Sequence, residues 1–414
     1  MQNLRIWKYL SLPWMVIALF LFISFIFLAF LKGTQIEYLT NDYLLGLFKN
    51  TFILSFLTAF ISALIAVPLA ILVTFYDFPG KKFFSWGLSL SIAFPAYVYA
   101  FIYVGIFEYS SPISTYLRDF DITFPSIKNL FGASIILSMA LFPYIYLLLR
   151  VKLASVGLDL FRAAKSLGNN NTASIFKVII PSLFPVIVAG MTLVVFETIA
   201  DFGGVSTLRI ETFTVGIYNA WFGYQSYFSA ARLAGYLLVF VFIIIFIARF
   251  YEGKQNTLAQ KTSEVFEGIK LVPYKSFLAT LYCSTIFTIV FLIPLGQLLI
   301  WSYAENNFLS IENIHLIFNS LALGVIVSMI TVFFGIALAL AYRNDKKLRL
   351  IISVSTSGYA IPGSVISAGL LVSIGYFFGI SITSFGIVGL VLCLSLRFMT
   401  PAYNYLSASL VNIK

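Results

Sequence analysis

The sequence has 414 residues, of which 60% are hydrophobic and only 10% are charged. Since a soluble globular protein carries roughly a quarter charged residues, this composition excludes a soluble domain and predicts a chain of membrane spans of about 20 apolar residues each. The net charge of +10 comes from basic residues in short loops between apolar runs. This placement indicates membrane orientation and not nucleic-acid binding.

Apolar runs bounded by charges predict ten membrane-spanning helices, because lipid offers no partner for a free backbone amide. These runs lie at 13–31, 50–76, 84–107, 131–149, 182–200, 232–250, 277–303, 318–342, 350–378 and 382–407. The first run is longer than the core of a signal peptide, so we expect it to be retained as a span. A cytoplasmic N-terminus places most of the 26 Lys and Arg residues in inside segments, as the positive-inside rule requires.

The long inside loop carries the run RAAKSLGNNNTASIFKVIIP. Ala163, Ala164 and Leu167 lie at helical spacing on a short amphipathic helix, where small alanines let a partner surface approach closely. Gly168, followed by three asparagines, supplies a turn in which a positive φ is cheap. Pro181 is expected to open the next membrane helix, where a missing amide donor costs little. The run predicts a helix–turn–helix lever on the cytoplasmic face.

This run resembles the coupling loop of ABC importer permeases. That pattern is Glu-Ala-Ala, three residues, Gly, nine residues, an aliphatic, one residue, an aliphatic, then Pro. The matching positions are Ala163, Ala164, Gly168, Val178, Ile180 and Pro181. Arg162 stands where the family prefers Glu, and Asp159, three residues earlier, is the nearest acidic substitute. The resemblance implies a separate ATPase in two copies, one of which docks on this loop through a set of residues that comprises Arg162, Ala163, Ala164, Leu167, Gly168 and Pro181.

Two carboxylates follow at the outer end of the fifth run. Glu197 lies four residues before Asp201, so the two share one helix face if the helix continues that far. Acidic groups in or beside a span are costly and indicate a role in the translocation path, and a hard cation such as Fe³⁺ prefers oxygen ligands. The alternative is structural, in which Glu197 bonds a neighbouring span or pairs with Arg397. Arg397 is the one charge deep within a span, and it serves either such a pair or gating.

The segment FETIADFGGVSTLRIETFTVGIYNAWFG resembles the ferric-iron branch of these permeases. The matching residues are Glu197, Asp201, Phe202, Gly203, Thr212, Thr214, Gly216, Ile217, Tyr218, Trp221 and Phe222. The resemblance implies an importer of Fe³⁺ in the bacterial inner membrane. It also implies a periplasmic substrate-binding protein that delivers the ion, and alternating access driven by ATP hydrolysis in the ATPase partner.

The chain also resembles itself. The run that starts at Asn50 aligns without a gap with the run that starts at Asn319, and AFPAYVYA at Ala93 matches AIPGSVIS at Ala360. Ordered matches of this kind indicate two homologous halves. We therefore predict an all-α, polytopic transmembrane helical bundle made of two tandem halves of the type I ABC importer permease fold.

The predicted boundaries follow from the polar stretches. Residues 1–250 form the first half, with six spans and the coupling loop at 150–181. Residues 251–276 form a cytoplasmic linker, and residues 277–414 form a second half with four spans. By comparison with the first half, we expect a second coupling motif and two further spans beyond Lys414, in a longer parent protein.

The sequence carries no sign of catalysis. The run G-x-x-x-x-G-K-[ST] does not occur, so the chain is not expected to bind ATP itself. Cys283 and Cys393 lie in apolar runs and His315 stands alone in a polar loop, a pattern that gives neither a disulfide framework nor metal-ligand spacing. We expect a transporter subunit with no enzyme activity, no cofactor and no resident metal.

Two alternatives remain open. The chain is either a permease for another small solute, such as a polyamine, phosphonate, thiamine or sulfate, or a secondary transporter driven by an ion gradient. The coupling loop favours an ABC permease, because a secondary carrier has no need of an ATPase-docking lever. A polytopic membrane enzyme is less favoured, since it requires ionisable groups clustered at one membrane depth.

Overall fold

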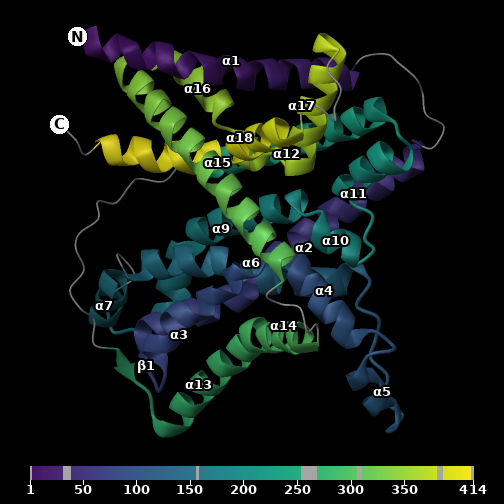
Figure 1. The fold of residues 1–414 in the computed structure, drawn as a ribbon. Coiled ribbons are helices and arrows are strands. Elements are labelled where there is room, and N and C mark those ends of the chain that lie inside the picture. Colours follow the sequence, from purple (N-terminus) through teal and green to yellow (C-terminus); the bar gives the residue numbers. More distant parts are fainter. Residues whose placement is uncertain are drawn as a thin grey trace. The chain divides into compact units, whose positions relative to one another are not determined.

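The computed structural model describes residues 2–30, 39–154, 158–252, 268–304, 310–379 and 386–411. In these ranges the chain is helical, apart from turns, loops and one pair of two-residue strands (Figure 1). Within this described part, eight helices are long and apolar enough to cross a membrane, and one bent pair is a ninth candidate. This confirms the prediction of an all-α, polytopic membrane protein.

The helices and strands follow one another in two series. Before the predicted linker lie α1 (Gln2–Phe30), α2 (Asn41–Phe75), β1 (Tyr76–Asp77), α3 (Lys81–Gly87), η1 (Leu88–Ala93), α4 (Ala96–Phe107), α5 (Pro112–Arg118), α6 (Leu130–Lys152), α7 (Leu158–Ser166), α8 (Asn171–Ser174), η3 (Ile175–Ile179), α9 (Ile180–Ala200), α10 (Gly203–Thr207), α11 (Phe213–Tyr218), η4 (Asn219–Gly223) and α12 (Tyr227–Glu252). From Ile269 onward lie β2 (Ile269–Lys270), α13 (Pro273–Phe287), η5 (Thr288–Leu292), α14 (Ile293–Ala304), α15 (Ile311–Asn344), η6 (Lys346–Leu348), α16 (Arg349–Ser355), η7 (Gly358–Ala360), α17 (Gly363–Phe378) and α18 (Gly386–Val411).

Two of the ten predicted spans are broken helices. In the run 84–107, the helical stretch Lys81–Ala93 meets the stretch Ala96–Arg118 at a bend of 88°. In the run 350–378, α16 and η7 precede α17, which has only 16 residues. Neither run forms one continuous helix. The physical reason is an X-Pro pair in each, because proline disfavours the helical region for the residue before it.

The two breaks have the same backbone conformation. Phe94 has φ −95° and ψ 121°, and Ile361 has φ −100° and ψ 128°. The prolines that follow cap the next helix with φ and ψ of −59° and 150° at Pro95 and of −54° and 139° at Pro362. These positions are the ones that the proposed duplication aligns. The boundaries of the two halves stay a prediction.

The chain folds into two compact units that do not coincide with the predicted halves. One unit comprises Met1–Leu47, Phe213–Ile243 and Asn306–Lys414. The other comprises Phe48–Thr212 and Ile244–Glu305. Each unit therefore contains segments from both sides of the linker.

The first helix of each predicted half packs with helices of the other half. Helix α1 lies in the unit that holds most of the second half, and α13 lies in the unit that holds most of the first. In the first unit, α1 packs against α15, α16 and α17. Trp14 of α1 is buried and donates a hydrogen bond from Nε1 to the Ser355 carbonyl oxygen at 3.3 Å, and Ser24 donates to Ser373 Oγ at 2.8 Å. In the second unit, α13 packs against α3 and η1, while α14 packs against α4.

A turn of π-helix, η5, interrupts the long helix formed by α13 and α14. Pro294 follows this turn and has no N–H to offer to the carbonyl of Val290 four residues earlier. The hydroxyl of Tyr99 on α4 donates a hydrogen bond to that carbonyl oxygen, and the hydroxyl of Tyr103, one turn further, donates to the carbonyl oxygen of Ile289, both at 2.6 Å. Two tyrosines on one face of α4 therefore bind the backbone groups that the irregular turn presents.

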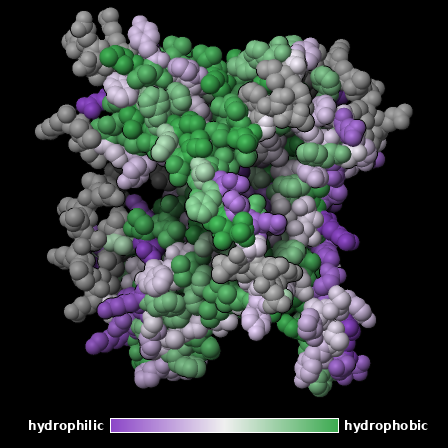
Figure 2. Space-filling view, viewed as in Figure 1, coloured by the Kyte–Doolittle hydropathy of each residue, from purple (hydrophilic) through white to green (hydrophobic). Residues whose placement is uncertain are grey.

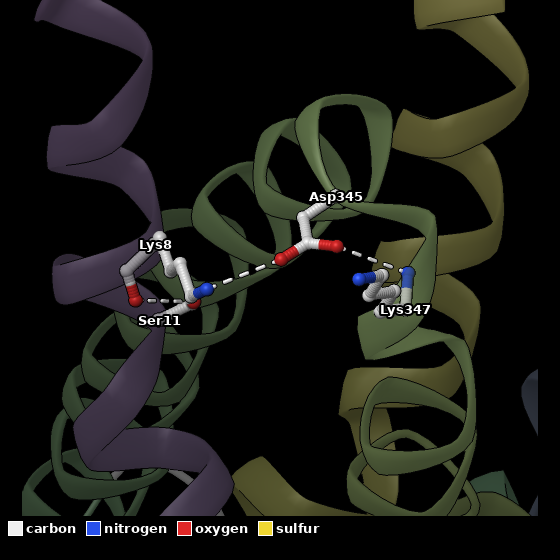
Figure 3. A network of polar contacts seen from close by, with 4 residues as sticks. All are labelled: Lys8, Ser11, Asp345 and Lys347. Atoms are coloured by element: carbon white, nitrogen blue, oxygen red, sulfur yellow. Dashed lines mark hydrogen bonds and ion pairs between the residues drawn. The ribbon is translucent and has the colours of Figure 1, made fainter.

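Two polar contacts join segments that the charge count assigns to one side of the membrane. In the first unit, Lys8 near the start of α1 lies 3.1 Å from Asp345 at the end of α15 (Figure 3). The Lys8 hydrogen bond and the backbone N–H of Lys347 hold the pKa of Asp345 below its usual range. In the second unit, β1 pairs in parallel with β2, so the loop after α2 adjoins the end of the linker.

Hydrophobic side chains cover much of the visible surface, which is drawn green in Figure 2. The outward face of α15 illustrates the pattern, since Phe318 is 65% exposed and Met329 is 68% exposed. Exposed apolar surface of this extent is unusual for a soluble monomer. It is what a lipid environment accepts.

Candidate functional site

The predicted coupling loop forms two helices joined by a left-handed residue. Helix α7 ends at Ser166, and Gly168 follows with φ +85°. The N–H of Gly168 donates to the Lys165 carbonyl oxygen at 3.0 Å, and the N–H of Asn169 donates to the Ala164 carbonyl oxygen at 3.2 Å. Backbone bonds of this kind satisfy the last carbonyl groups of a helix. The predicted turn at Gly168 is confirmed.

The asparagines after Gly168 have separate tasks that the sequence analysis did not assign. The Asn169 side chain donates a hydrogen bond from Nδ2 to the Ala164 carbonyl oxygen at 3.2 Å, which closes the end of α7. Asn170 begins α8, because its Oδ1 accepts a hydrogen bond from the N–H of Ala173 at 2.7 Å. An asparagine three residues before a free amide is a recognisable N-cap signal. The turn is therefore fixed by side chains on both sides.

Helix α7 has one buried face and one exposed face. Ala164 is 2% exposed, and Phe161 packs its ring 5.1 Å from that of Phe75 on α2. Ala163 is exposed, and Leu167 is 83% exposed. The prediction that both alanines face a partner is therefore wrong for Ala164, which lies about a quarter turn from Ala163 and anchors α7 to the body of the protein.

Arg162 and Asp159 are the remaining predicted residues of α7, one in the middle of the helix and one in its first turn. Arg162, which stands in the place of the family's glutamate, lies on the exposed side. Asp159, the predicted acidic substitute, lies in the first turn, where a carboxylate is favoured by the helix dipole. An acidic residue at this position therefore has a structural explanation that needs no partner.

Pro181 lies inside a longer helical segment than predicted. Helix α8, the π turn η3 and α9 run on without a break, so the candidate span extends over Asn171–Ala200 and not only over 182–200. The π turn directly precedes Ile180 and Pro181, as η5 precedes Ile293 and Pro294. A widened turn accommodates a proline that would otherwise clash in a regular helix. The coupling segment is thus continuous with a membrane helix.

Glu197 and Asp201 do not share a helix face. Helix α9 ends at Ala200, and Asp201 adopts an extended backbone with φ −69° and ψ 131°. Asp201 Oδ2 accepts a hydrogen bond from the N–H of Val205 at 2.9 Å, so its carboxylate caps the start of α10. Glu197 stays within α9 and is partly buried. The two carboxylates were expected to share a face only if the helix continued to Asp201, and it ends one residue before.

The glycines after Asp201 allow α10 to pack closely. A Cβ on Gly203 would lie 2.7 Å from Cβ of Tyr97 on α4, and a Cβ on Gly204 would lie 3.1 Å from Cδ2 of Leu137 on α6. The motif Asp-Phe-Gly-Gly therefore has a packing role in addition to any role in the path. Sequence reasoning did not identify this role, because nothing in the sequence shows which helix lies against α10.

Arg397 lies on α18, partly buried, beside the broken helix of the first unit. A Cβ on Gly363, the first residue of α17, would lie 3.3 Å from Nη1 of Arg397. One turn along α18, Thr400 donates a hydrogen bond from Oγ1 to the Thr356 carbonyl oxygen and accepts one from the Tyr359 N–H at 3.0 Å. Glu197 lies in the other unit, so the pair of Arg397 with Glu197 stays a prediction.

Among the described residues, no three His, Cys, Asp or Glu side chains gather around one point. In the second unit, the structure joins the turn at Gly168 to one long helical segment, Asn171–Ala200, which carries Glu197 near its far end.

The comparison with known families identifies the class. Residues 66–263 match the model described as "Binding-protein-dependent transport system inner membrane component". The matched range includes the coupling segment, α9 and α10. The chain therefore contains the inner-membrane permease domain of binding-protein-dependent transport systems.

Individual relatives share this domain at low identity. The Fe(3+)-transport system permease protein FbpB 2 of Haemophilus influenzae is 25% identical over 350 residues, which cover 81% of this chain and 65% of that protein. The sulfate transport system permease protein CysT of Escherichia coli is 25% identical over 169 residues, which cover 41% of this chain and 60% of that protein. The probable sulfate permease cysT of Prototheca wickerhamii is 27% identical over 181 residues, or 42% of this chain and 70% of that protein. The chain spans just under two thirds of the length of the first two relatives.

Proposed function

We propose that this chain is the permease subunit of an ABC importer in the bacterial inner membrane, and that it carries ferric iron delivered by a periplasmic binding protein. The observation that carries the proposal is the coupling segment. It presents Ala163 and Leu167 on an exposed face, turns at the left-handed Gly168, and continues through α8 into a membrane helix. A partner that pushes this face moves a rigid lever.

The geometry suggests how the push is transmitted. Ala164 and Phe161 fix α7 to the body of the second unit, while the turn at Gly168 lets α7 and α8 meet at an angle. The continuous helix from Asn171 to Ala200 ends at α10, which packs on α4 and α6. A displacement at α8 is therefore carried along one helix to the opposite side of the membrane. ATP is bound and hydrolysed by two copies of the separate ATPase, and alternating access follows.

The choice of ferric iron rests on sequence likeness. The iron-transport relative covers 81% of this chain, whereas the sulfate-transport relative from Escherichia coli covers 41%. The segment from Phe196 to Gly223 carries the motif that resembles the ferric-iron branch. Of the two carboxylates, we assign only Glu197 to the translocation path, because the Asp201 carboxylate caps α10.

Uptake measurements test the function. A strain from which this gene has been deleted is compared with the same strain carrying the complete operon on a plasmid. Both are assayed for uptake of radioactive ferric iron and of radioactive sulfate. We expect iron uptake to be lost on deletion and restored by the plasmid. A Leu167→Ser variant should reduce uptake at least tenfold and weaken co-purification of the ATPase, because hot-spot apolar contacts are worth about 2 kcal/mol or more.

The matched control is Leu350→Ser, which alters an apolar side chain of similar exposure, 77%, on α16. Its uptake should stay near that of the unaltered protein. Unchanged uptake in the Leu167→Ser variant argues against docking at α7. Uptake that continues without ATP but stops with a protonophore indicates the secondary-transporter alternative.

Sulfate is a second candidate substrate, because two sulfate permeases match the chain at similar identity. Loss of sulfate uptake with unchanged iron uptake assigns the chain to that substrate and leaves the permease mechanism intact. If deletion changes neither iron nor sulfate uptake but abolishes uptake of a polyamine, a phosphonate or thiamine, that solute is the substrate.

A further inference from the structure

A pocket of about 540 Å³ lies beside the coupling segment in the second unit. Three parts of the chain line it: the end of α2 with β1, the start of α8, and the stretch from β2 into α13. These parts are far apart in sequence, and the pairing of β1 with β2 holds two of them together. The hydrogen bond from Thr280 Oγ1 to the Pro79 carbonyl oxygen, at 3.1 Å, fixes α13 against the same loop.

Two lysines give the pocket a positive charge. Lys270 on β2 and Lys275 in the first turn of α13 both line it, and both are exposed. Within the part of the chain that the structure describes, neither ammonium group forms an ion pair. Tyr76 also lines the pocket, and its phenol hydroxyl is a hydrogen-bond donor at neutral pH.

The rest of the wall is apolar and continues onto a membrane helix. Leu271, Val272 and Leu278 line the pocket, and Val272 is 58% exposed. On α13 nearby, Tyr274 is 70% exposed and Phe277 is 64% exposed. Aromatic side chains at the start of a span are typical of the membrane–water interface. The pocket therefore has a charged part at the headgroup level and an apolar part that leads toward the lipid.

We propose that this pocket binds the phosphate headgroup of an anionic phospholipid. The ammonium groups of Lys270 and Lys275 face the phosphate, and the acyl chains lie along the apolar side chains of α13. Basic pockets at the cytoplasmic ends of spans bind anionic headgroups in this way. A free phosphate would use the same lysines but would gain nothing from the apolar wall.

The pocket has a consequence for coupling that rests on the proposed function. Asn171 and Thr172, the first residues of α8, form part of its wall. A bound lipid therefore touches the coupling lever directly and ties it to the end of α13. Anionic lipid should support ATP-driven uptake by keeping α8 in place against the membrane surface.

Lipid retention tests the site without any transport measurement. The full chain is purified from membranes in mild detergent, mixed with micelles that contain phosphatidylglycerol and phosphatidylcholine in equal amounts, and examined by native mass spectrometry. We expect retained phosphatidylglycerol to dominate. The double variant Lys270→Gln/Lys275→Gln should reduce its retention about 30-fold, which corresponds to roughly 1 kcal/mol per lysine. The variant Lys270→Arg/Lys275→Arg should retain it.

The matched control is Lys346→Gln/Lys347→Gln, which removes two neighbouring lysines from η6. Its retention should equal that of the unaltered protein. Equal loss in both double variants indicates a general charge effect and overturns the proposal, as does equal retention in the Lys270→Gln/Lys275→Gln variant. If millimolar inorganic phosphate displaces the lipid, or if a soluble phosphate ester binds as well as phosphatidylglycerol, the ligand is a free phosphate and not a lipid. Because retention needs no ATPase, a failed uptake assay leaves this result unaffected.

Discussion

Gly168 combines a left-handed backbone with empty surroundings. Its φ is +85°, and no atom lies within 4 Å of the position that a Cβ would occupy. A substitution here tests the backbone conformation alone, because no side chain clashes. Any L-residue at a positive φ pays a steric penalty, which asparagine pays least.

The first prediction is that Gly168→Val lowers the stability of the coupling segment by about 1–2 kcal/mol and reduces substrate uptake severalfold. Gly168→Asn should stay close to the unaltered protein. Limited proteolysis of the segment measures the first effect, and transport in vesicles with the ATPase measures the second. Gly296→Ala is the control, since its added Cβ also meets no atom within 4 Å and its φ is not in the left-handed region. Intact coupling in the valine variant shows that the left-handed turn is not needed.

Substitutions of Asp201 can distinguish a structural role of its carboxylate from a role of its charge in transport. Its Oδ2 accepts the Val205 N–H at 2.9 Å, and the amide oxygen of asparagine can accept the same bond without a charge. If the carboxylate is a cap, Asp201→Asn keeps both stability and uptake. Asp201→Ala should destabilise the protein by about 1 kcal/mol, because the Val205 N–H loses its acceptor.

The cap role leads us to expect near-normal uptake in Asp201→Asn and reduced protein levels in Asp201→Ala. Thermal unfolding in detergent and uptake in whole cells give the two readouts. Loss of uptake in a stable Asp201→Asn variant would show that the negative charge itself is needed, and Asp201 would return to the translocation path.

At the scale of elements, the contact between α4 and the helix of α13 and α14 has a specific polar basis. Pro294 cannot donate to the Val290 carbonyl, and the hydroxyl of Tyr99 supplies the missing hydrogen bond at 2.6 Å. A carbonyl without a partner is costly in the membrane, where no water replaces the lost donor. This contact should therefore contribute to the association of these helices.

We predict that Tyr99→Phe destabilises the protein by about 1 kcal/mol, within the range measured for hydrogen bonds between membrane helices. Tyr97→Phe is the matched control, because Tyr97 lies on the same helix and is 54% exposed. Unfolding in mixed micelles, followed by the tryptophan fluorescence of the protein, compares the two variants. Equal stability in both contradicts a role for the Tyr99 hydroxyl.

The elements also show what the sequence could and could not predict. Hydropathy located eight long helices, because a span needs about 20 apolar residues wherever it lies. It did not reveal the breaks in 84–107 and 350–378, although Pro95 and Pro362 were visible in the sequence. A proline within a span is compatible with either a kink or a break, and the choice depends on neighbouring helices. The repeated Phe-Pro and Ile-Pro pairs were the available signal.

The same limit applies to the candidate site. The turn at Gly168 was predictable, since glycine followed by asparagine favours a left-handed residue. The inward orientation of Ala164 also had a signal, because Ala164 follows Phe161 by three residues and shares the apolar face of the amphipathic helix α7. The cap at Asp201 depended on where α9 ends, which composition alone leaves undetermined.

At the scale of the molecule, the described contacts agree with a single orientation of each unit. Lys8 meets Asp345 in the first unit. In the second, β1 adjoins β2, and α8 lines the same pocket as both strands. The basic-residue count assigns all of these segments to the cytoplasmic side. On the opposite side, Lys128 pairs with Glu108 at 2.8 Å and holds the pKa of that carboxyl below its usual range.

The last prediction follows from this orientation. Single cysteines are placed at Asn170 and at Ser126 in a protein whose Cys283 and Cys393 have been changed to serine. The cysteine at position 126 should react with a membrane-impermeant thiol reagent in intact cells, since it lies in the loop beside Lys128. The cysteine at position 170 should react only after the membrane is permeabilised, because α8 lies on the side where the basic residues gather. Labelling of position 170 in intact cells would place the coupling segment outside, where no ATPase can reach it, and would overturn both the topology and the proposed mechanism.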